Sequence, residues 1–247
     1  MTPELSIEGA VATVTLRRPA VANRLEPDDL EVIVAHLDAV DATPAVLVLR
    51  FRGEGAHFCA GADIGRIGTR RSVRFDEMVD RVERARPVTI AALHGGVFGG
   101  ATDLALACDF RVGGPATRMF MPAARLGLHF YASGLERYVT RLGVDIAKRL
   151  FLTAEEIDAD EMRRIGFLTH FAGEEGVEAC VDALTARIAA MAPLPLIGMK
   201  KHLNRIARSE LDREELAADV ARSLASEDLA EGAAAFRERR APRFRGR

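Results

Sequence analysis

HGGVFGGATDLALACD, residues 94–109, joins two glycine pairs to the first turns of a helix. It follows Val88–Leu93 (VTIAAL), a short apolar run that predicts a buried strand. The free N–H groups and the positive dipole end of a helix that begins near Gly100 favour negative charge. Glycine-rich turns between a strand and a helix are mostly structural, so this segment alone is weak evidence for a ligand site.

A second glycine-punctuated loop, AHFCAGADI (residues 56–64), follows the apolar run Ala45–Phe51, which also predicts a buried strand. Small side chains in such a loop let a ligand or another backbone come close and leave amide N–H groups uncovered. The two loops are therefore candidates for the backbone donors of one site.

The rest of the chain predicts an α/β fold whose last third is nearly all helical. Ile7–Leu16 alternates around a glycine turn, which indicates paired strands. Phe110–Val112 indicates a further short strand. Helices are expected at 27–40, 70–86, 101–109, 134–142, 146–151, 154–165 and 177–191, and from Pro195 to the end.

Composition narrows the class of protein. The chain has 247 residues, 49% of them hydrophobic, a net charge of −2 and a pI of about 6.3. Near-neutral charge gives no electrostatic reason to expect nucleic acid or an anionic membrane as partner. The N-terminus lacks the cations of a signal peptide, and no apolar run reaches membrane-spanning length. We therefore expect a soluble, cytoplasmic protein.

The cysteines and histidines indicate neither a disulfide framework nor a metal site. Cys59, Cys108 and Cys180 are far apart in apolar runs, as reduced thiols in the cytosol would be. No His, Asp and Glu cluster has ligand spacing, so no metal is expected. His94, directly before the glycine pairs, is interpreted as structural.

Six segments, in order, resemble the crotonase (enoyl-CoA hydratase/isomerase) superfamily over almost the whole chain. The resemblance implies a spiral of ββα units at 1–190 that holds an acyl-CoA site. It also implies a helical region at 191–247 that packs on the core and on neighbouring subunits of a homotrimer or a dimer of trimers. The segments are LRRPAVANRL (16–25), FCAGADI (58–64), HGGVFGGATDLALACD (94–109), RLGLHFYASGLERYVTRLG (125–143), PLPLIGMKKHLN (193–204) and EDLAEGAAAFRERRAPRFRG (227–246).

The same resemblance implies an acyl-CoA thioester whose carbonyl oxygen binds two backbone N–H groups, those of Ala62 and Gly100. Preorganised donors to a thioester oxyanion contribute about 3–4 kcal/mol each. Coenzyme A belongs to the substrate, and no other cofactor is implied. The positions that match the coenzyme A path are Ala22, Ala60, Ala62, Asp63 and Ile64, with Lys200 near the phosphates.

The sequence departs from the family's hydratases at their two catalytic glutamates. Asp103 matches the first, and Ala123 matches the second, so a two-carboxylate mechanism cannot be carried over. Other superfamily members place a reacting aspartate at the position of Tyr131, and a decarboxylase places a tyrosine at that of Phe130. Tyr131 can donate a hydrogen bond or a proton, and the His129 imidazole can act as a base or an acid. The alternative is that these two side chains only pack the loop and cap the following helix.

Three functions follow. The leading one is an enoyl-CoA hydratase-like lyase of fatty acid metabolism, in which Asp103, the only aligned carboxylate, orients water and returns the same proton to the α-carbon. The second is decarboxylation, or hydrolysis of a C–C or thioester bond, assisted by Tyr131 and His129. The third is a non-catalytic subunit that binds coenzyme A or a partner. The arginine-rich stretch 66–86 could meet coenzyme A phosphates, although surface charge on a helix is the commoner explanation.

Overall fold

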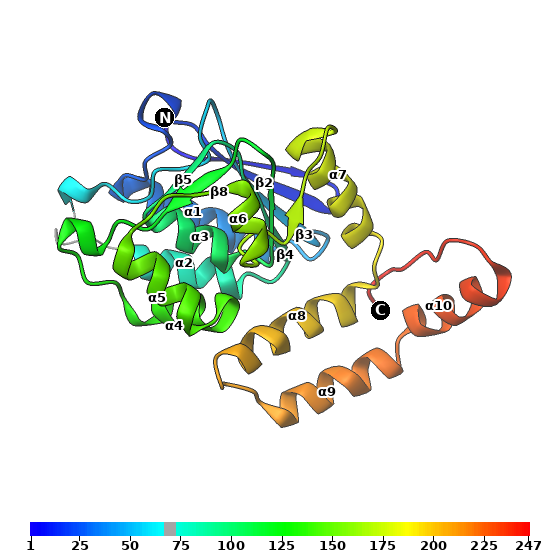
Figure 1. Cartoon of the computed structure of the whole chain (residues 1–247). Helices are drawn as coiled ribbons and strands as arrows, with labels where there is room; N and C mark the ends of the chain where they lie inside the picture. Colours follow the sequence, from blue (N-terminus) through cyan, green and yellow to red (C-terminus); the bar gives the residue numbers. More distant parts are fainter. Residues whose placement is uncertain (67–72) are drawn as a thin grey trace.

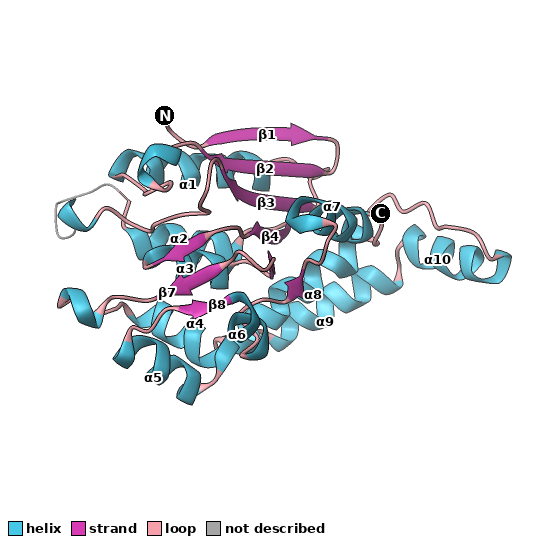
Figure 2. Cartoon of the chain, turned by 45° about the horizontal axis from the view of Figure 1, so that its top comes forward, coloured by secondary structure: helices cyan, strands magenta, loops and turns pink. Residues whose placement is uncertain are grey.

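A twisted, mostly parallel sheet forms the centre of the computed structural model, which describes residues 1–66 and 73–247 (Figures 1 and 2). Within these residues its strand order is β1-β2-β3-β4-β6-β9, and only β1 runs antiparallel to its neighbour. The strands are β1 (Glu4–Glu8), β2 (Val11–Leu16), β3 (Val48–Gly53), β4 (Val88–Ala92), β6 (Phe110–Gly113) and β9 (His170–Phe171).

A smaller sheet stands beside the carboxyl ends of β3 and β4. It pairs β5 (Gly96–Phe98) with β7 (Arg118–Phe120) in parallel and β7 with β8 (Ile157–Asp158) antiparallel. Because β5 directly follows β4 and directly precedes α3, this sheet fixes where the glycine-rich turn leaves the main sheet.

Helices cover both faces of the main sheet because successive strand residues point to opposite faces. Val48 and Ile90 pack with α7 on one face, whereas Leu49 and Ala91 belong to the larger core with α1, α2 and α3. The helices are α1 (Pro27–Asp41), α2 (Phe75–Arg84), α3 (Gly100–Ala107), α4 (Ala132–Leu142), α5 (Val144–Thr153), α6 (Ala159–Arg164), α7 (Gly176–Ala189), α8 (Pro193–Ala207), α9 (Arg213–Leu224) and α10 (Glu227–Glu238).

The structure confirms the α/β class and most of the expected elements. The strand pair at 7–16, the helix from Pro27 and the strand from Val88 lie as expected. The expected helix at 154–165 is wrong in its first part, because Ile157 pairs with Met119 in the small sheet and α6 begins only at Ala159. The helix expected at 70–86 begins at Phe75, and residues 70–72 lie outside the described part.

The C-terminal region is helical but not one continuous helix. α8, α9 and α10 form an arm that extends from the body, and a coil returns from Arg239 (Figure 1). The breaks coincide with capping residues: Asp212 accepts N–H groups at the start of α9, and Ser226 accepts one at the start of α10. Among the described residues no single helix could cross a membrane by length and composition, but the sharply bent pair α7–α8 passes that test.

Candidate active site

The two glycine-rich loops lie side by side at the carboxyl edge of the main sheet. β3 and β4 are adjacent and parallel, so the loops that follow them leave from the same edge. Backbone bonds then join the loops: the N–H of Phe98 donates to the Cys59 carbonyl at 3.0 Å, and Cys59 N–H donates to the Gly96 carbonyl at 3.3 Å. Segments about forty residues apart are thereby held in one register.

The amides of Ala62 and Gly100 meet at this junction. A β-carbon on Gly61 would lie 2.7 Å from the Gly100 nitrogen, which shows how closely the two loops approach. Gly61 also has φ +81°, a conformation that favours glycine. Among the described residues no acceptor binds the N–H of either Ala62 or Gly100. Gly100 is the first residue of α3, so its N–H also lies at the positive end of the helix dipole.

A cavity of about 730 Å³ opens in front of these two amides. Its wall is mostly aromatic and aliphatic, as is usual for small-molecule sites. Phe98 and Phe120 pack with their ring centroids 5.0 Å apart, and Phe75 lies over Gly100 near Tyr131. The described lining residues are Ala60, Ala62, Ile64, Arg74, Phe75, Asp76, Phe98, Gly99, Gly100, Phe120, Met121, Pro122, Ala123, Leu126, Leu128, His129, Phe130 and Tyr131.

Tyr131 brings a hydroxyl group to this wall and connects it to Asp103 behind it. The Tyr131 hydroxyl donates to Oδ2 of Asp103 at 2.5 Å. Burial is the largest cause that raises the pKa of Tyr131 well above its ordinary value, and the Asp103 charge adds to the rise. Tyr131 is therefore a neutral phenol at neutral pH.

Asp103 lies behind Tyr131 rather than on the cavity wall, and its side chain is completely buried. Nη1 of Arg137 donates to the same Oδ2 atom at 2.6 Å, whereas Oδ1 has no hydrogen-bond partner among the described residues. Burial raises the pKa of Asp103 above its ordinary value, and the Arg137 guanidinium and the Tyr131 hydroxyl oppose that rise.

His129 and Phe130 occupy the same loop with different surroundings. His129 is exposed and lines the cavity, and its Nδ1 lies 2.8 Å from the Phe130 carbonyl oxygen. Phe130 is nearly buried and stacks on Tyr131 with 4.3 Å between ring centroids. Ala123 is buried in the cavity wall. His94, interpreted as structural, bonds with its Nε2 to the Gly55 carbonyl oxygen.

The expected coenzyme A residues divide into those near the cavity and one away from it. Ala60 and Ile64 line the cavity, and the Ala22 carbonyl accepts the Ala60 N–H, so Ala22 adjoins the same loop. Asp63 does not line the cavity, and its Oδ1 accepts the N–H of Gly65.

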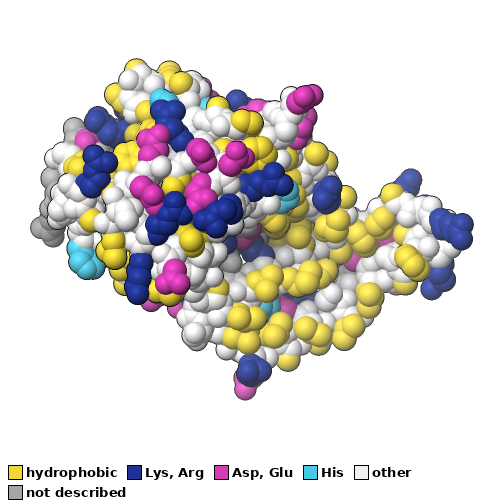
Figure 3. Space-filling model, in the orientation of Figure 1, with side chains coloured by type: hydrophobic (Ala, Val, Ile, Leu, Met, Phe, Trp, Pro, Cys, Tyr) yellow, Lys and Arg dark blue, Asp and Glu magenta, His cyan; other side chains and the backbone are white. Residues whose placement is uncertain are grey.

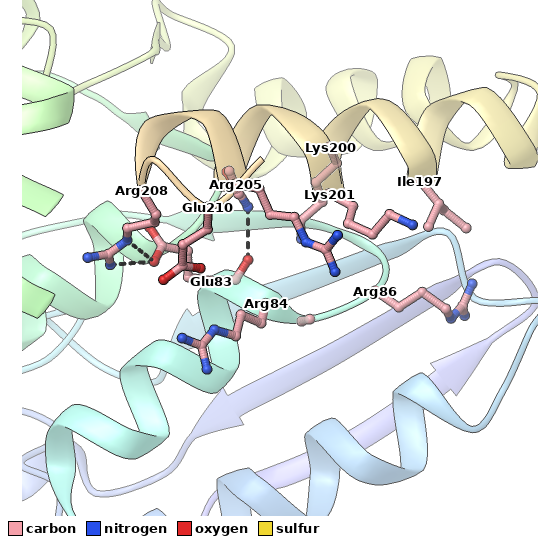
Figure 4. Close-up of a pocket in the computed structure, with 11 residues that line it drawn as sticks. Glu83, Arg84, Arg86, Ile197, Lys200, Lys201, Arg205, Arg208 and Glu210 are labelled. Atoms are coloured by element: carbon pink, nitrogen blue, oxygen red, sulfur yellow. Dashed lines mark hydrogen bonds and ion pairs between the residues drawn. The ribbon is translucent and has the colours of Figure 1, made fainter. Parts of the chain in front are cut away.

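Lys200 lies elsewhere, on a cleft of about 370 Å³ between α8 and the end of α2 (Figure 4). No described residue lines both this cleft and the cavity. The Lys200 ammonium is nearly buried, 2.9 Å from the Asp109 carboxylate, and also donates to the Pro87 carbonyl oxygen. The structure thus brings Ala60, Ala62, Ile64, Gly100, His129 and Tyr131 together and separates Lys200 from them.

Sequence reasoning missed two contributors, Arg137 and Phe75. Arg137 lies in a run of alternating charged and apolar residues that looks like an ordinary amphipathic helix. Phe75 stands at the start of α2 and belongs to none of the six segments that carry the family resemblance. Only the packing of α2, α3 and α4 against one another reveals both roles.

Comparison with known proteins agrees with the resemblance in the sequence. The family model for enoyl-CoA hydratase/isomerase matches residues 6–247. A probable enoyl-CoA hydratase of Bacillus subtilis is 29% identical over 98% of both chains. A crotonyl-CoA hydratase of Syntrophomonas wolfei is 32% identical over 97% of this chain and 96% of its own.

Solved structures agree with the fold. The crystal structure of an enoyl-CoA hydratase/carnithine racemase from Magnetospirillum magneticum has a TM-score of 0.92 and 28% identity, covering 100% of this chain and 96% of its own. One of an enoyl-CoA hydratase/isomerase family member has a TM-score of 0.91 and 26% identity, covering 99% and 98%. The fold class expected from the sequence is thereby confirmed, and this chain belongs to the enoyl-CoA hydratase/isomerase family of enzymes.

Proposed function

We propose that this enzyme adds water to the double bond of a 2-enoyl-CoA thioester, with Ala62 and Gly100 as donors to the thioester oxygen. One observation carries the proposal: two uncommitted amide N–H groups border the same cavity as a tyrosine hydroxyl that is bonded to a buried carboxylate. Addition at the β-carbon moves negative charge onto the thioester oxygen. Amides aimed at that oxygen bind the enolate more tightly than the ground state.

Tyr131 and Asp103 act together on the proton in this mechanism. Because the Tyr131 proton points to Asp103, the phenol oxygen offers a lone pair to water in the cavity. As the water oxygen bonds to the β-carbon, Tyr131 takes a proton from it and passes its own proton to Asp103. The reverse relay returns one proton to the α-carbon, so one water is consumed and no proton is left over. A carboxyl whose pKa burial raises is suited to hold that proton briefly.

His129 has an orienting role in this proposal. If Nδ1 carries the proton, it donates to the Phe130 carbonyl oxygen at 2.8 Å, and Nε2 keeps a lone pair. From its place on the cavity wall, that lone pair accepts a hydrogen bond from the attacking water.

The proposed path of coenzyme A follows the loop of Ala60, Ala62 and Ile64, with Ala22 and Asp63 beside it. Three of these residues line the cavity, and their small or apolar side chains suit the pantetheine arm. Lys200 is left out of this path because Asp109 and the Pro87 carbonyl already hold its ammonium.

The test is turnover of crotonyl-CoA, followed as loss of the enoyl absorbance. Crotonyl-CoA is the first choice because a relative of 32% identity is named crotonyl-CoA hydratase. Tyr131→Phe and Asp103→Asn are each expected to lower kcat by about 10²–10⁴ with little change in KM. Wild-type turnover that neither substitution affects would sink the proton relay. No thermal shift with any acyl-CoA would favour a non-catalytic subunit instead.

A second candidate is decarboxylation of a substrate that carries a carboxyl group on its α-carbon. It is favoured by Ala123, which lies in the cavity wall and supplies no acid there. This reaction needs the oxyanion donors and one proton donor only. Release of CO₂ from malonyl-CoA or methylmalonyl-CoA, with no loss of crotonyl-CoA, would establish it over hydration.

We also propose that the arm binds further copies of this chain, in a trimer or a dimer of trimers. On α8, Met199, Leu203 and Ile206 are spaced as one face of a helix and are more than half exposed. Phe236 on α10 is 86% exposed. Figure 3 shows apolar side chains along the arm and around the hollow between it and the body. Contiguous exposed apolar surface of this kind marks an interface.

A further inference from the structure

Arg137 on α4 is completely buried and contacts three carboxylates. Its Nη1 donates to Asp103 at 2.6 Å, its Nη2 to Asp80 at 2.7 Å, and its Nε to Glu83 at 3.2 Å. Burial of a guanidinium costs several kcal/mol of desolvation, which bonds to carboxylates offset. Three carboxylates from two elements, α2 and α3, therefore converge on one cation.

The groups that surround Asp103 come from each packed element. α4 contributes Arg137 and Tyr138, the cavity loop contributes Tyr131, and α2 contributes Glu83. Farther out, Arg208, directly after α8, donates to Glu83 at 3.1 Å through Nε (Figure 4). Of these groups, Arg137 is the cation in direct contact with the Asp103 carboxylate.

We infer that Arg137 is a positioning residue, which holds Asp103 as a carboxylate and so keeps the Tyr131 hydroxyl turned toward it at the cavity wall. This inference rests on the proposed function and deepens it. The two donors share Oδ2, so the guanidinium fixes the acceptor of the phenol. Oδ1 has no partner among the described residues and is where a proton would add.

Removal of the guanidinium charge would leave the Tyr131 hydrogen bond as the remaining opposition to the effect of burial on Asp103. Burial raises the pKa of Asp103, and the Arg137 charge is the largest contribution in the other direction. An uncharged side chain at 137 would let Asp103 take up a proton at a higher pH. A protonated Asp103 no longer holds the Tyr131 hydroxyl by charge and cannot accept the proton of that hydroxyl, so the proton relay stops.

The experiment titrates Tyr131 by NMR of protein labelled with ¹³C at the tyrosine Cζ. The chain has two tyrosines, so two resonances are expected, and Tyr138→Phe assigns the one from Tyr131. In wild type this resonance shifts as Asp103 is protonated, and in Asp103→Asn that step is lost. In Arg137→Met and Arg137→Gln the midpoint is expected to rise by about 1–3 pH units. Arg137→Lys, which keeps a cation, is expected to lie between.

Arg141→Met is the matched control, since Arg141 lies one turn along α4 and contacts Glu83 but not Asp103. Its midpoint should equal that of wild type. If neither uncharged variant folds, Glu83→Gln is the deciding variant. Glu83 shares Arg137 with Asp103, and its charge raises the pKa of Asp103, so its loss should lower the midpoint. An unchanged midpoint in Arg137→Met or Arg137→Gln, or an unchanged or raised one in Glu83→Gln, overturns the inference.

The acid limb of kcat/KM should move with the NMR midpoint in each variant. A merely structural role would lower stability and leave that limb in place. If wild type turns over no acyl-CoA, the proposed function fails while the NMR midpoints still report on Arg137.

Discussion

Gly61 illustrates how much a single residue decides in this site. With φ +81°, it turns the chain between Cys59, which is bonded to the second glycine loop, and Ala62, which lines the cavity. Its missing side chain leaves room for the Gly100 amide. The same absence of a β-carbon thus serves both the turn and the approach of the two donors.

Gly61→Ala should therefore lower both the stability of the protein and its kcat. The methyl group would lie 2.7 Å from the Gly100 nitrogen and 2.8 Å from the Phe98 carbonyl oxygen, both backbone atoms that cannot move alone. We expect a loss of about 2–4 kcal/mol in the free energy of unfolding, measured in urea, and at least a hundredfold loss in kcat. Gly166→Ala is the matched control, since Gly166 has φ +78° with no atom within 4 Å of its β-carbon.

That control should cost about 1 kcal/mol of stability through backbone strain and leave kcat unchanged. Equal activity of Gly61→Ala and Gly166→Ala would contradict the close approach of the two amides.

Residue identity predicted part of the site but not its charge state. Tyr131 and Asp103 were expected to lie near the substrate from the family resemblance, and the structure places Tyr131 on the wall and Asp103 behind it. Arg137 had no signal in the sequence, because its three carboxylate partners lie 34 to 57 positions away. A contact of that separation depends on how α2, α3 and α4 pack.

At the scale of elements, α3 combines a polar start with a buried remainder. Its first residue, Gly100, lines the cavity, and Ala101 to Ala107 are all buried. Apart from Thr102 and Asp103, these buried residues are apolar, as expected of a helix that lies in a core. Cys108, directly after α3, is fully buried too, and burial raises the pKa of its thiol to about 12.

This burial predicts a loss of stability in alkali. The folded thiol of Cys108 keeps its proton to about pH 12, whereas the unfolded thiol ionises near its ordinary 9.0. The contribution of this protonated thiol to the free energy of unfolding is therefore fully present below pH 9 and is lost as pH rises toward 12. The free energy of unfolding should fall by about 2 kcal/mol at pH 10.5 from this thiol alone.

Cys108→Ala should cost about 1 kcal/mol at pH 7 and show a correspondingly smaller fall between pH 8 and pH 10.5 in urea unfolding. The half-buried Cys180 supplies the control, and Cys180→Ala should keep nearly the wild-type fall. An identical pH dependence for Cys108→Ala and wild type would refute the assignment.

Long elements with clear patterns were predictable, and short ones were not. α1 begins with Pro27 and acidic residues in its first turn, signals that depend on neighbours in the sequence. β7, β8 and β9 have two or three residues each, too few for any periodicity. They exist because partner strands lie beside them, and for that reason the start of α6 was misjudged.

At the scale of the whole molecule, the arm of α8, α9 and α10 is joined to the body through α8, which contacts α2 and β4, and α10 extends outward (Figure 1). Its contact with the body includes Arg208, which donates to Glu83, and Asn204, which donates to the Glu83 carbonyl oxygen. Glu83 also binds Arg137, so the base of the arm and the candidate site share one carboxylate.

Assembly should depend on the exposed apolar face of the arm. Light scattering of the wild type is expected to give the mass of a trimer or a hexamer. Phe236→Glu and Leu203→Glu should each lower the measured mass toward that of a monomer. Leu152→Glu is the control, because Leu152 is 74% exposed on α5, outside the arm. A monomeric wild type, or assembly unaffected by both arm substitutions, would contradict the proposal.

The sequence by itself determined the family, the α/β class and the two glycine loops, because strand and helix patterns and positive-φ glycines act through neighbouring residues. Tertiary structure alone decided that Asp103 lies behind Tyr131, that Arg137 holds it, and that Lys200 is paired away from the cavity. These are contacts between side chains far apart in sequence, and burial sets their charge states. Both exist only once the helices have packed.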